Sequence, residues 1–304
     1  MADEIENEEY LVRNSVDSNV AGSKSLSFKW KLIIIITISI LVLTAIGFTL
    51  FFVLKDDKED SIEVLPPIII NPISEYTHCI IWLHGMDSSP EKFQDLFKTE
   101  VPFAKKENTK IIYMRAPYQI MSYNKQNYTS WFDIFWFPIN SSESYNFTEA
   151  TLSRRMLEKI INQEAKELKG NYKNIFIGGH SQGACVSLYT AYNFKELLGG
   201  VLVCSGVLFP QAEIVGNKNK LKVFLAHGDG DLAIPFAFHN ETVKRIENFE
   251  GVKKYYYKNH GHGITDYEKI DMGKFINDTL NENSGCYIIL DTILKLIFLF
   301  ILYI

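Results

Sequence analysis

The residues most able to do chemistry in this chain are a serine, an aspartate and a histidine that occur in that order. Ser181 lies in Gly179-His-Ser-Gln-Gly183, which follows a short apolar run and precedes small residues that can begin a helix. This pattern is typical of a nucleophile elbow, a sharp strand-to-helix turn that exposes a serine hydroxyl. Side chains at Gly179 and Gly183 would collide with neighbouring elements as the chain reverses. The motif therefore predicts a nucleophilic serine.

Two loops that follow predicted strands supply the acid and the base. A serine hydroxyl is a weak nucleophile, so acyl transfer needs a histidine to accept its proton and a carboxylate to orient the imidazole. These partners follow the serine in the order Asp, His. Asp231, after the predicted strand 221–225, is the favoured acid, and Asp229 is the alternative. His262, after the last predicted strand, is favoured as the base over His260.

An early loop contains a candidate for the oxyanion hole. The intermediate of acyl transfer carries an oxyanion that needs preorganised N–H donors. One donor is the N–H of the residue after the nucleophile, here Gln182, and the other comes from a loop after an early strand. The run Leu83-His-Gly-Met86 fits that loop, so we expect the Met86 N–H to be the second donor. His84 is expected to be a loop residue that is hydrogen-bonded to backbone.

Apolar runs alternate with helical patterns from about Thr77 onward, which indicates βαβ units and a mostly parallel sheet. The expected strands cover residues 79–83, 110–114, 174–177, 200–204, 221–225 and 252–257. Apolar residues at helical spacing predict helices over 149–168, 182–197, 236–249 and 265–280. The pattern predicts an α/β-hydrolase fold with helices on both faces of the sheet and the chemical residues at strand ends.

Several segments carry a resemblance to a known family: Trp82-Leu-His-Gly-Met-Asp87, Ser130-Trp-Phe-Asp-Ile134, Gly178-Gly-His-Ser-Gln-Gly183, Ser187-Leu-Tyr-Thr-Ala191, His227-Gly-Asp-Gly-Asp231 and Phe275-Ile276. Together, over about residues 77–280, they resemble the acyl-protein thioesterase/carboxylesterase/lysophospholipase family of serine hydrolases. The resemblance implies a compact α/β-hydrolase with little or no lid. It places the triad on Ser181, Asp231 and His262, and the oxyanion donors on Met86 and Gln182.

Two parts of this resemblance need separate interpretation. The family's early loop usually reads His-Gly-x-Gly-Asp, whereas His84-Gly-Met-Asp87 lacks the second glycine, so a shorter or differently shaped loop is expected. In the Ser130-to-Ile134 segment, Trp131 and Phe132 fit core packing or contact with an acyl chain. Asp133 is expected to hold this loop near the active site.

Composition excludes several classes of protein. The 304 residues are 47% hydrophobic and 22% charged, which fits one large globular domain. The formal net charge of -5 and the lack of a dense Lys/Arg block argue against a nucleic-acid partner. The four cysteines have no metal-site spacing, and buried free thiols are favoured over a Cys79–Cys204 pair. Neither a metal nor an organic cofactor is expected.

The segment 32–54 carries no charged residue and is long enough to cross a bilayer as a helix. It begins too far from Met1 for an ordinary cleavable signal, so we expect a transmembrane signal anchor over 31–55. Lysines flank the amino side of this segment, and a net acidic run flanks its carboxyl side. Because positive flanks stay on the cytosolic side, the sequence places residues 1–30 in the cytosol as a disordered tail. A stalk (56–76) would then lead to a catalytic domain (77–283) in the secretory lumen or outside the cell.

Potential glycosylation sites support that topology, because all of them follow the apolar segment: Asn127, Asn140, Asn146, Asn240 and Asn277. The role of the apolar tail (284–304) stays open between a second membrane segment, a surface helix, a lipid-anchor signal and an artefact of the gene model.

The function expected from these features is a membrane-anchored serine hydrolase that cleaves acyl esters or thioesters through an acyl-Ser181 intermediate. The alternatives are a lysophospholipase and a catalytically inactive hydrolase fold that serves as a binding module. A dienelactone-hydrolase-like or peptidase-like enzyme is disfavoured by Ser130-Trp-Phe-Asp-Ile134 and by the absence of an added lid or propeller domain.

Overall fold

The computed structural model describes residues 66–282, together with Lys29 and Thr37. Apart from Lys29 and Thr37, the predicted cytosolic tail (1–30) and the predicted membrane anchor (31–55) therefore lie outside the described residues, as do the apolar tail (284–304) and Cys286. Within the described part, no helix is both long and apolar enough to span a bilayer. The membrane anchor over 31–55 and the membrane topology of the chain therefore remain predictions.

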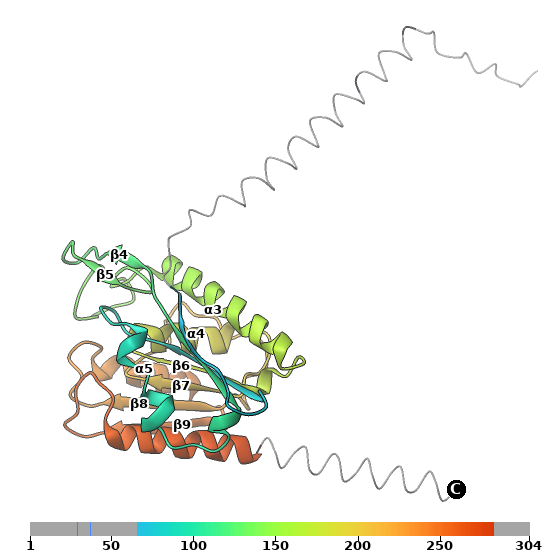
Figure 1. The fold of residues 1–304 in the computed structure, drawn as a ribbon. Helices are drawn as coiled ribbons and strands as arrows, with labels where there is room; N and C mark the ends of the chain where they lie inside the picture. Colours follow the sequence, from blue (N-terminus) through green and yellow to red (C-terminus); the bar gives the residue numbers. More distant parts are fainter. Residues whose placement is uncertain (1–28, 30–36, 38–65, 283–304) are drawn as a thin grey trace, which may run out of the picture. The chain divides into compact units, whose positions relative to one another are not determined.

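A seven-stranded sheet forms the centre of the domain, in the order β1-β3-β2-β6-β7-β8-β9 (Figure 1). Only β1 is antiparallel to its neighbour, and the other pairs are parallel. A separate two-stranded ribbon is formed by β4 and β5. The strands are β1 (Ile68–Ile70), β2 (His78–Leu83), β3 (Thr109–Met114), β4 (Tyr118–Ile120), β5 (Asn127–Thr129), β6 (Ile175–His180), β7 (Gly200–Cys204), β8 (Val223–Gly228) and β9 (Val252–Tyr257).

Helices cover both faces of this sheet, which is why its central strands are apolar at nearly every position. On one face α3 (Phe147–Glu167), α4 (Gln182–Asn193) and α5 (Phe236–Ile246) pack against alternate strand residues such as Ile81 and Val203. On the other face a helix over 266–282 packs with the segment Leu96–Glu100 against the intervening residues. Shorter helical turns are Pro90–Lys92, Lys106–Asn108 and Tyr172–Asn174.

The predicted α/β-hydrolase architecture is confirmed, but the domain begins earlier than residue 77. Ile68–Ile70, expected in the stalk, forms the edge strand β1 and pairs with β3. The Ile73 and Ser74 N–H groups both donate to the Glu107 carbonyl, which ties the next residues to the same edge. The ribbon of β4 and β5 was not predicted either. The expected helix 182–197 ends earlier, because Phe194 has extended backbone angles.

The two faces also separate the buried thiols. Cys79 packs on the face covered by α3 and α4, and Cys204 on the opposite face. Both are free, as is Cys185. Among the described cysteines the expectation of buried free thiols is confirmed, and the Cys79–Cys204 alternative is wrong.

Glu268, on the helix 266–282, is a buried carboxyl that should make the stability of the fold depend on pH. Its side chain is 2% exposed, and its Oε1 atom has no hydrogen-bond partner. Burial raises the pKa of Glu268 to about 7. A carboxyl whose pKa is raised in the folded state stabilises the fold while protonated and loses that contribution as the pH rises through the folded pKa.

We therefore expect Glu268→Gln to raise the stability at about pH 8, by an amount on the order of 1–3 kcal/mol, and to have little effect at about pH 5. Thermal unfolding of both proteins at the two pH values measures this difference. An equal effect at both values would show that ionisation of Glu268 does not limit stability.

Candidate active site

Ser181 lies at the tight turn between β6 and α4, as its motif predicts. Its backbone has φ 57° and ψ -122°, a conformation that non-glycine residues rarely adopt. The Ser181 N–H donates to the Cys204 carbonyl at 3.0 Å, which holds the turn to β7. A Cβ atom on Gly183 would lie 2.2 Å from the Leu83 carbonyl oxygen, and one on Gly179 would lie 2.5 Å from the same atom. Both glycines are therefore required by close backbone contact.

The structure brings Ser181, His262 and Asp231 into a continuous chain of hydrogen bonds. His262 Nδ1 lies 2.7 Å from Asp231 Oδ2, and His262 Nε2 lies 2.8 Å from Ser181 Oγ. Because the ionised carboxylate only accepts, Nδ1 carries the proton and Nε2 is free to accept the serine proton. This is the geometry that a general base needs.

Backbone donors hold the Asp231 carboxylate in place. Its Oδ1 atom accepts the N–H groups of Ala233 and Ile234, each at 2.9 Å. Burial is the largest single influence and opposes ionisation of this carboxyl. The hydrogen bond and charge of His262, the Ile234 N–H and His227 together outweigh it and keep the pKa of Asp231 below its usual value. The ionised form is thus the one that the site stabilises.

The alternative acid and base have other contacts. Asp229 Oδ1 accepts the Asn259 N–H at 2.6 Å and so links the acid loop to the histidine loop. His260 Nε2 lies 3.0 Å from the Gly263 carbonyl. The geometry therefore selects Asp231 and His262, and Asp229 links the two loops instead.

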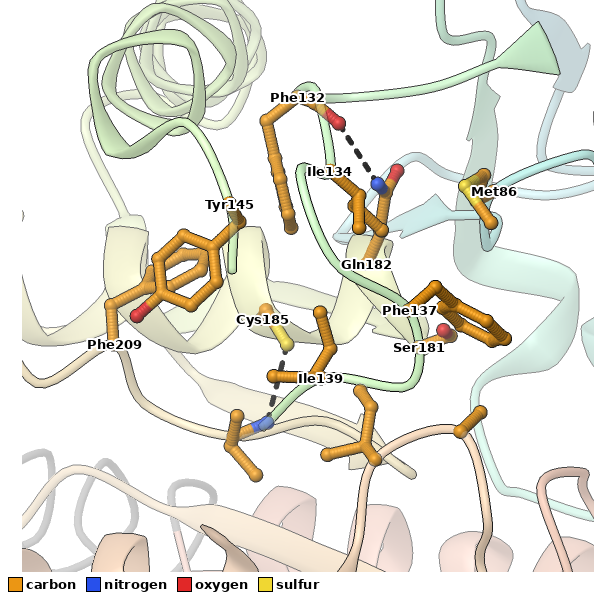
Figure 2. A pocket seen from close by; sticks show the side chains of 13 residues that line it. Met86, Phe132, Ile134, Phe137, Ile139, Tyr145, Ser181, Gln182, Cys185 and Phe209 are labelled. Atoms are coloured by element: carbon orange, nitrogen blue, oxygen red, sulfur yellow. Dashed lines mark hydrogen bonds between the residues drawn. The ribbon is translucent and has the colours of Figure 1, made fainter. Parts of the chain in front are cut away.

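The predicted oxyanion donors lie beside the serine. Met86 and Gln182 line the same cavity as Ser181 (Figure 2). Gln182 is the first residue of α4, where backbone N–H groups lack partners within the helix. A Cβ atom on Gly85 would lie 3.1 Å from Ser181 Cβ, so the early loop approaches the nucleophile closely. The missing second glycine in this loop does not prevent that approach.

The side chain of Gln182 has a function that sequence reasoning missed. Its Oε1 atom accepts from Ser130 Oγ at 2.9 Å and from the Trp131 N–H at 3.1 Å. Its Nε2 atom donates to the Phe132 carbonyl at 2.9 Å (Figure 2). The start of α4 is thereby fastened to the Ser130-to-Ile134 segment.

A second set of bonds fastens that segment to the early loop. Trp131 Nε1 donates to the His84 carbonyl at 2.6 Å, and the indole is buried. His84 Nε2 accepts the Ala116 N–H at 3.1 Å, so its proton is on Nδ1, which donates to the Gly85 carbonyl at 2.7 Å. Burial lowers the pKa of His84 to about 4. His84 is thus a neutral residue bonded to backbone, as expected, and Trp131 packs in the core.

Phe132 and Asp133 separate into different environments. Phe132 lines the cavity beside Ser181 and contacts Phe209, with ring centroids 5.4 Å apart. Asp133 points elsewhere: it accepts from the N–H and the hydroxyl of Ser122, at 2.7 and 2.6 Å. Of the two aromatic residues, Phe132 is therefore the one placed to contact a substrate, and Asp133 secures the loop.

An apolar cavity extends from Ser181. Figure 2 shows its side chains converging from the loop after β5, from α4 and from the loop after β7. The lining is almost entirely apolar apart from Ser181 and Gln182: Met86, Phe132, Ile134, Phe137, Ile139, Tyr145, Cys185, Val207, Phe209, Ala233 and Ile234. Such a cavity fits a flexible hydrocarbon chain better than a polar group.

The fold and this arrangement together define a serine hydrolase of the α/β type. A model of the phospholipase/carboxylesterase family matches residues 66–280. The chain is 29% identical to acyl-protein thioesterase 1 homolog 1 of Dictyostelium discoideum, over 68% of this chain and 93% of that protein. It is 27% identical to lysophospholipase-like protein 1 of Mus musculus, over 68% and 89%.

Solved structures agree on the fold. SOBER1 of Arabidopsis thaliana aligns with a TM-score of 0.60 at 23% identity, covering 67% of this chain and 99% of that one. The chain therefore belongs to the phospholipase/carboxylesterase family of α/β-hydrolases, and it is an enzyme of the serine hydrolase class.

Proposed function

We propose that the protein hydrolyses acyl esters or thioesters through an acyl-Ser181 intermediate. His262 Nε2 takes the proton of the Ser181 hydroxyl as Oγ attacks the acyl carbonyl carbon. His262 then gives this proton to the leaving alcohol or thiol as its bond to the acyl carbon breaks. Water, activated by the same histidine, releases the acid and restores Ser181. The observation that carries this proposal is the unbroken chain of hydrogen bonds from Ser181 through His262 to Asp231.

The backbone N–H groups of Met86 and Gln182 are the proposed donors to the oxyanion. Support comes from their position beside Ser181 and from the bonds that hold both loops through Trp131 and the Gln182 side chain. Preorganised donors of this kind stabilise negative charge without reorganisation during the reaction.

The proposed substrates carry a medium-to-long acyl chain. The apolar cavity beside Ser181 favours this class, and the relatives are named as acyl-protein thioesterase and lysophospholipase-like proteins. Ester and thioester substrates both fit, because the triad chemistry is the same for either leaving group. Lysophospholipid is the alternative substrate.

A panel of substrates tests this assignment. Initial rates would be compared for p-nitrophenyl butyrate and palmitate, for a palmitoyl thioester and for a lysophospholipid. We expect the palmitoyl substrates to have higher kcat/KM than the butyrate, and we expect Ser181→Ala to remove all four activities. An absence of turnover on every substrate would favour the inactive binding module.

Membrane anchoring and a lumenal or extracellular domain are further parts of the proposal. They are supported by the uncharged segment 32–54 and by exposed candidate acceptors at Asn127, Asn140 and Asn240. Asn146 and Asn277 are less accessible acceptors, because Asn146 caps α3 and Asn277 Oδ1 accepts the Ala104 N–H. Glycosidase digestion of the protein expressed in a eukaryotic cell should increase its gel mobility. Unchanged mobility would argue against this topology.

A further inference from the structure

His227, near the end of β8, is a buried histidine that the proposed catalytic cycle does not use. It is 1% exposed. Its Nε2 atom lies 2.9 Å from the Ile234 carbonyl oxygen and 3.4 Å from Asp231 Oδ2. The imidazole therefore faces the acid loop from inside the domain, on the side away from solvent.

The contacts of His227 define its protonation. A carbonyl oxygen only accepts, so Nε2 carries the proton and donates it to Ile234. The other ring nitrogen, Nδ1, is buried without a partner, as expected for the unprotonated atom of a neutral ring. Burial lowers the pKa of His227, which also favours the neutral form. His227 is thus a fixed donor.

Ile234 connects this donor to the carboxylate of Asp231. Its N–H donates to Asp231 Oδ1, while its carbonyl accepts from His227. Asp231 Oδ1 also accepts from Ala233, and Oδ2 accepts from His262 at 2.7 Å. The backbone that supplies two donors to the acid is therefore held in place by the His227 side chain, which also points its proton toward Oδ2.

We propose that His227 is a positioning residue that holds the loop 231–234 and, through it, keeps the Asp231 carboxylate aligned with His262. This inference rests on the proposed role of Asp231 and His262 in the reaction. It assigns a function to a side chain that touches neither Ser181 nor the cavity.

The surroundings of His227 offer a matched control. His239, on α5, packs against the His227 ring with centroids 4.8 Å apart, and neither of its buried ring nitrogens has a partner. It stacks on Phe236 at a centroid distance of 5.2 Å. His262 and His227 are the titratable side chains that act on the Asp231 carboxyl. Behind them, His239 packs on the His227 ring, and the His180 ring packs against the His262 ring with centroids 4.9 Å apart.

The test compares three variants of the full chain. His227→Phe keeps an aromatic ring but removes the donor, His227→Gln restores an amide donor, and His239→Phe removes an unpartnered imidazole from the same cluster. We expect His227→Phe to lower kcat for p-nitrophenyl butyrate by about 10- to 100-fold with KM changed less than about threefold. His227→Gln should recover most of the loss, and His239→Phe should retain wild-type kcat.

The pH dependence of kcat/KM separates positioning from a general effect on the fold. Without the His227 donor, the negative charge of the Asp231 carboxylate is less compensated and stabilises the protonated form of His262 more strongly. The acidic limb of the kcat/KM profile should therefore lie at higher pH in His227→Phe than in the wild type. A folded His227→Phe protein with unchanged kcat would overturn the inference. So would a loss that His239→Phe reproduces, or one that leaves the acidic limb in place. These outcomes differ from a failure of the proposed function, in which the wild-type protein itself would lack esterase activity.

Discussion

Replacing Ser181 with alanine is expected to lower kcat for a p-nitrophenyl acyl ester by about 10⁴- to 10⁶-fold, as removal of a triad nucleophile does in serine proteases. Among the hydrogen bonds described, the one at His262 Nε2 joins it to the Ser181 hydroxyl, which makes this hydroxyl the group that the histidine can activate for attack. Steady-state assays at saturating substrate measure the effect.

The thermal stability of Ser181→Ala shows whether the variant is correctly folded. Alanine keeps the Cβ atom that packs near Gly85, and the Ser181 N–H bond to Cys204 involves only backbone. The thermal midpoint should therefore stay close to that of the wild type. A folded Ser181→Ala protein with more than about 10% of wild-type kcat would remove Ser181 from the proposed role.

Asp231→Asn is expected to reduce kcat by about 10⁴-fold, a loss comparable with that of the equivalent change in a serine protease. The Ala233 and Ile234 N–H groups require an acceptor at the Oδ1 position, so the asparagine oxygen must occupy it. The amide NH₂ then faces His262 Nδ1 and forces the ring proton onto Nε2. In that tautomer the histidine cannot accept the Ser181 proton.

Asp229→Asn is the matched control, because Asp229 lies in the same loop and its side chain accepts the Asn259 N–H through Oδ1. An asparagine oxygen can accept the same bond, and we expect less than about a tenfold change in kcat. Equal losses from the two substitutions would contradict the assignment of Asp231 as the acid.

The sequence was sufficient for the parts of the fold and site that depend on local pattern and chain order. The elbow has a short sequence motif that can be recognised locally, although its two glycines are required by contacts with Leu83 at the end of β2. In a parallel sheet, successive strand ends lie at one edge, which brings the loops carrying Ser181, Asp231 and His262 together. Gly200–Cys204 and Val252–Tyr257 were predicted at their observed bounds because they are bordered by clear turn residues.

The missed features depend on partners distant in the chain. Ile68–Ile70 lies between prolines that indicated a stalk, yet an edge strand tolerates such neighbours and pairs with β3 about forty residues later. The Gln182 side chain meets the Ser130-to-Ile134 segment across 50 or more positions. The sequence indicated His227 only as part of a motif, because its bond to the Ile234 carbonyl depends on the folded conformation of the loop 231–234.

The most direct test of the account is to locate the covalent adduct that a fluorophosphonate forms with the protein. Intact-protein mass spectrometry should show addition of one probe, and peptide mapping should place it on Ser181. The adduct should be absent from Ser181→Ala and should form much more slowly in Asp231→Asn. A probe attached to another residue, or equal labelling of wild type and Ser181→Ala, would contradict the claim that Ser181 is the nucleophile.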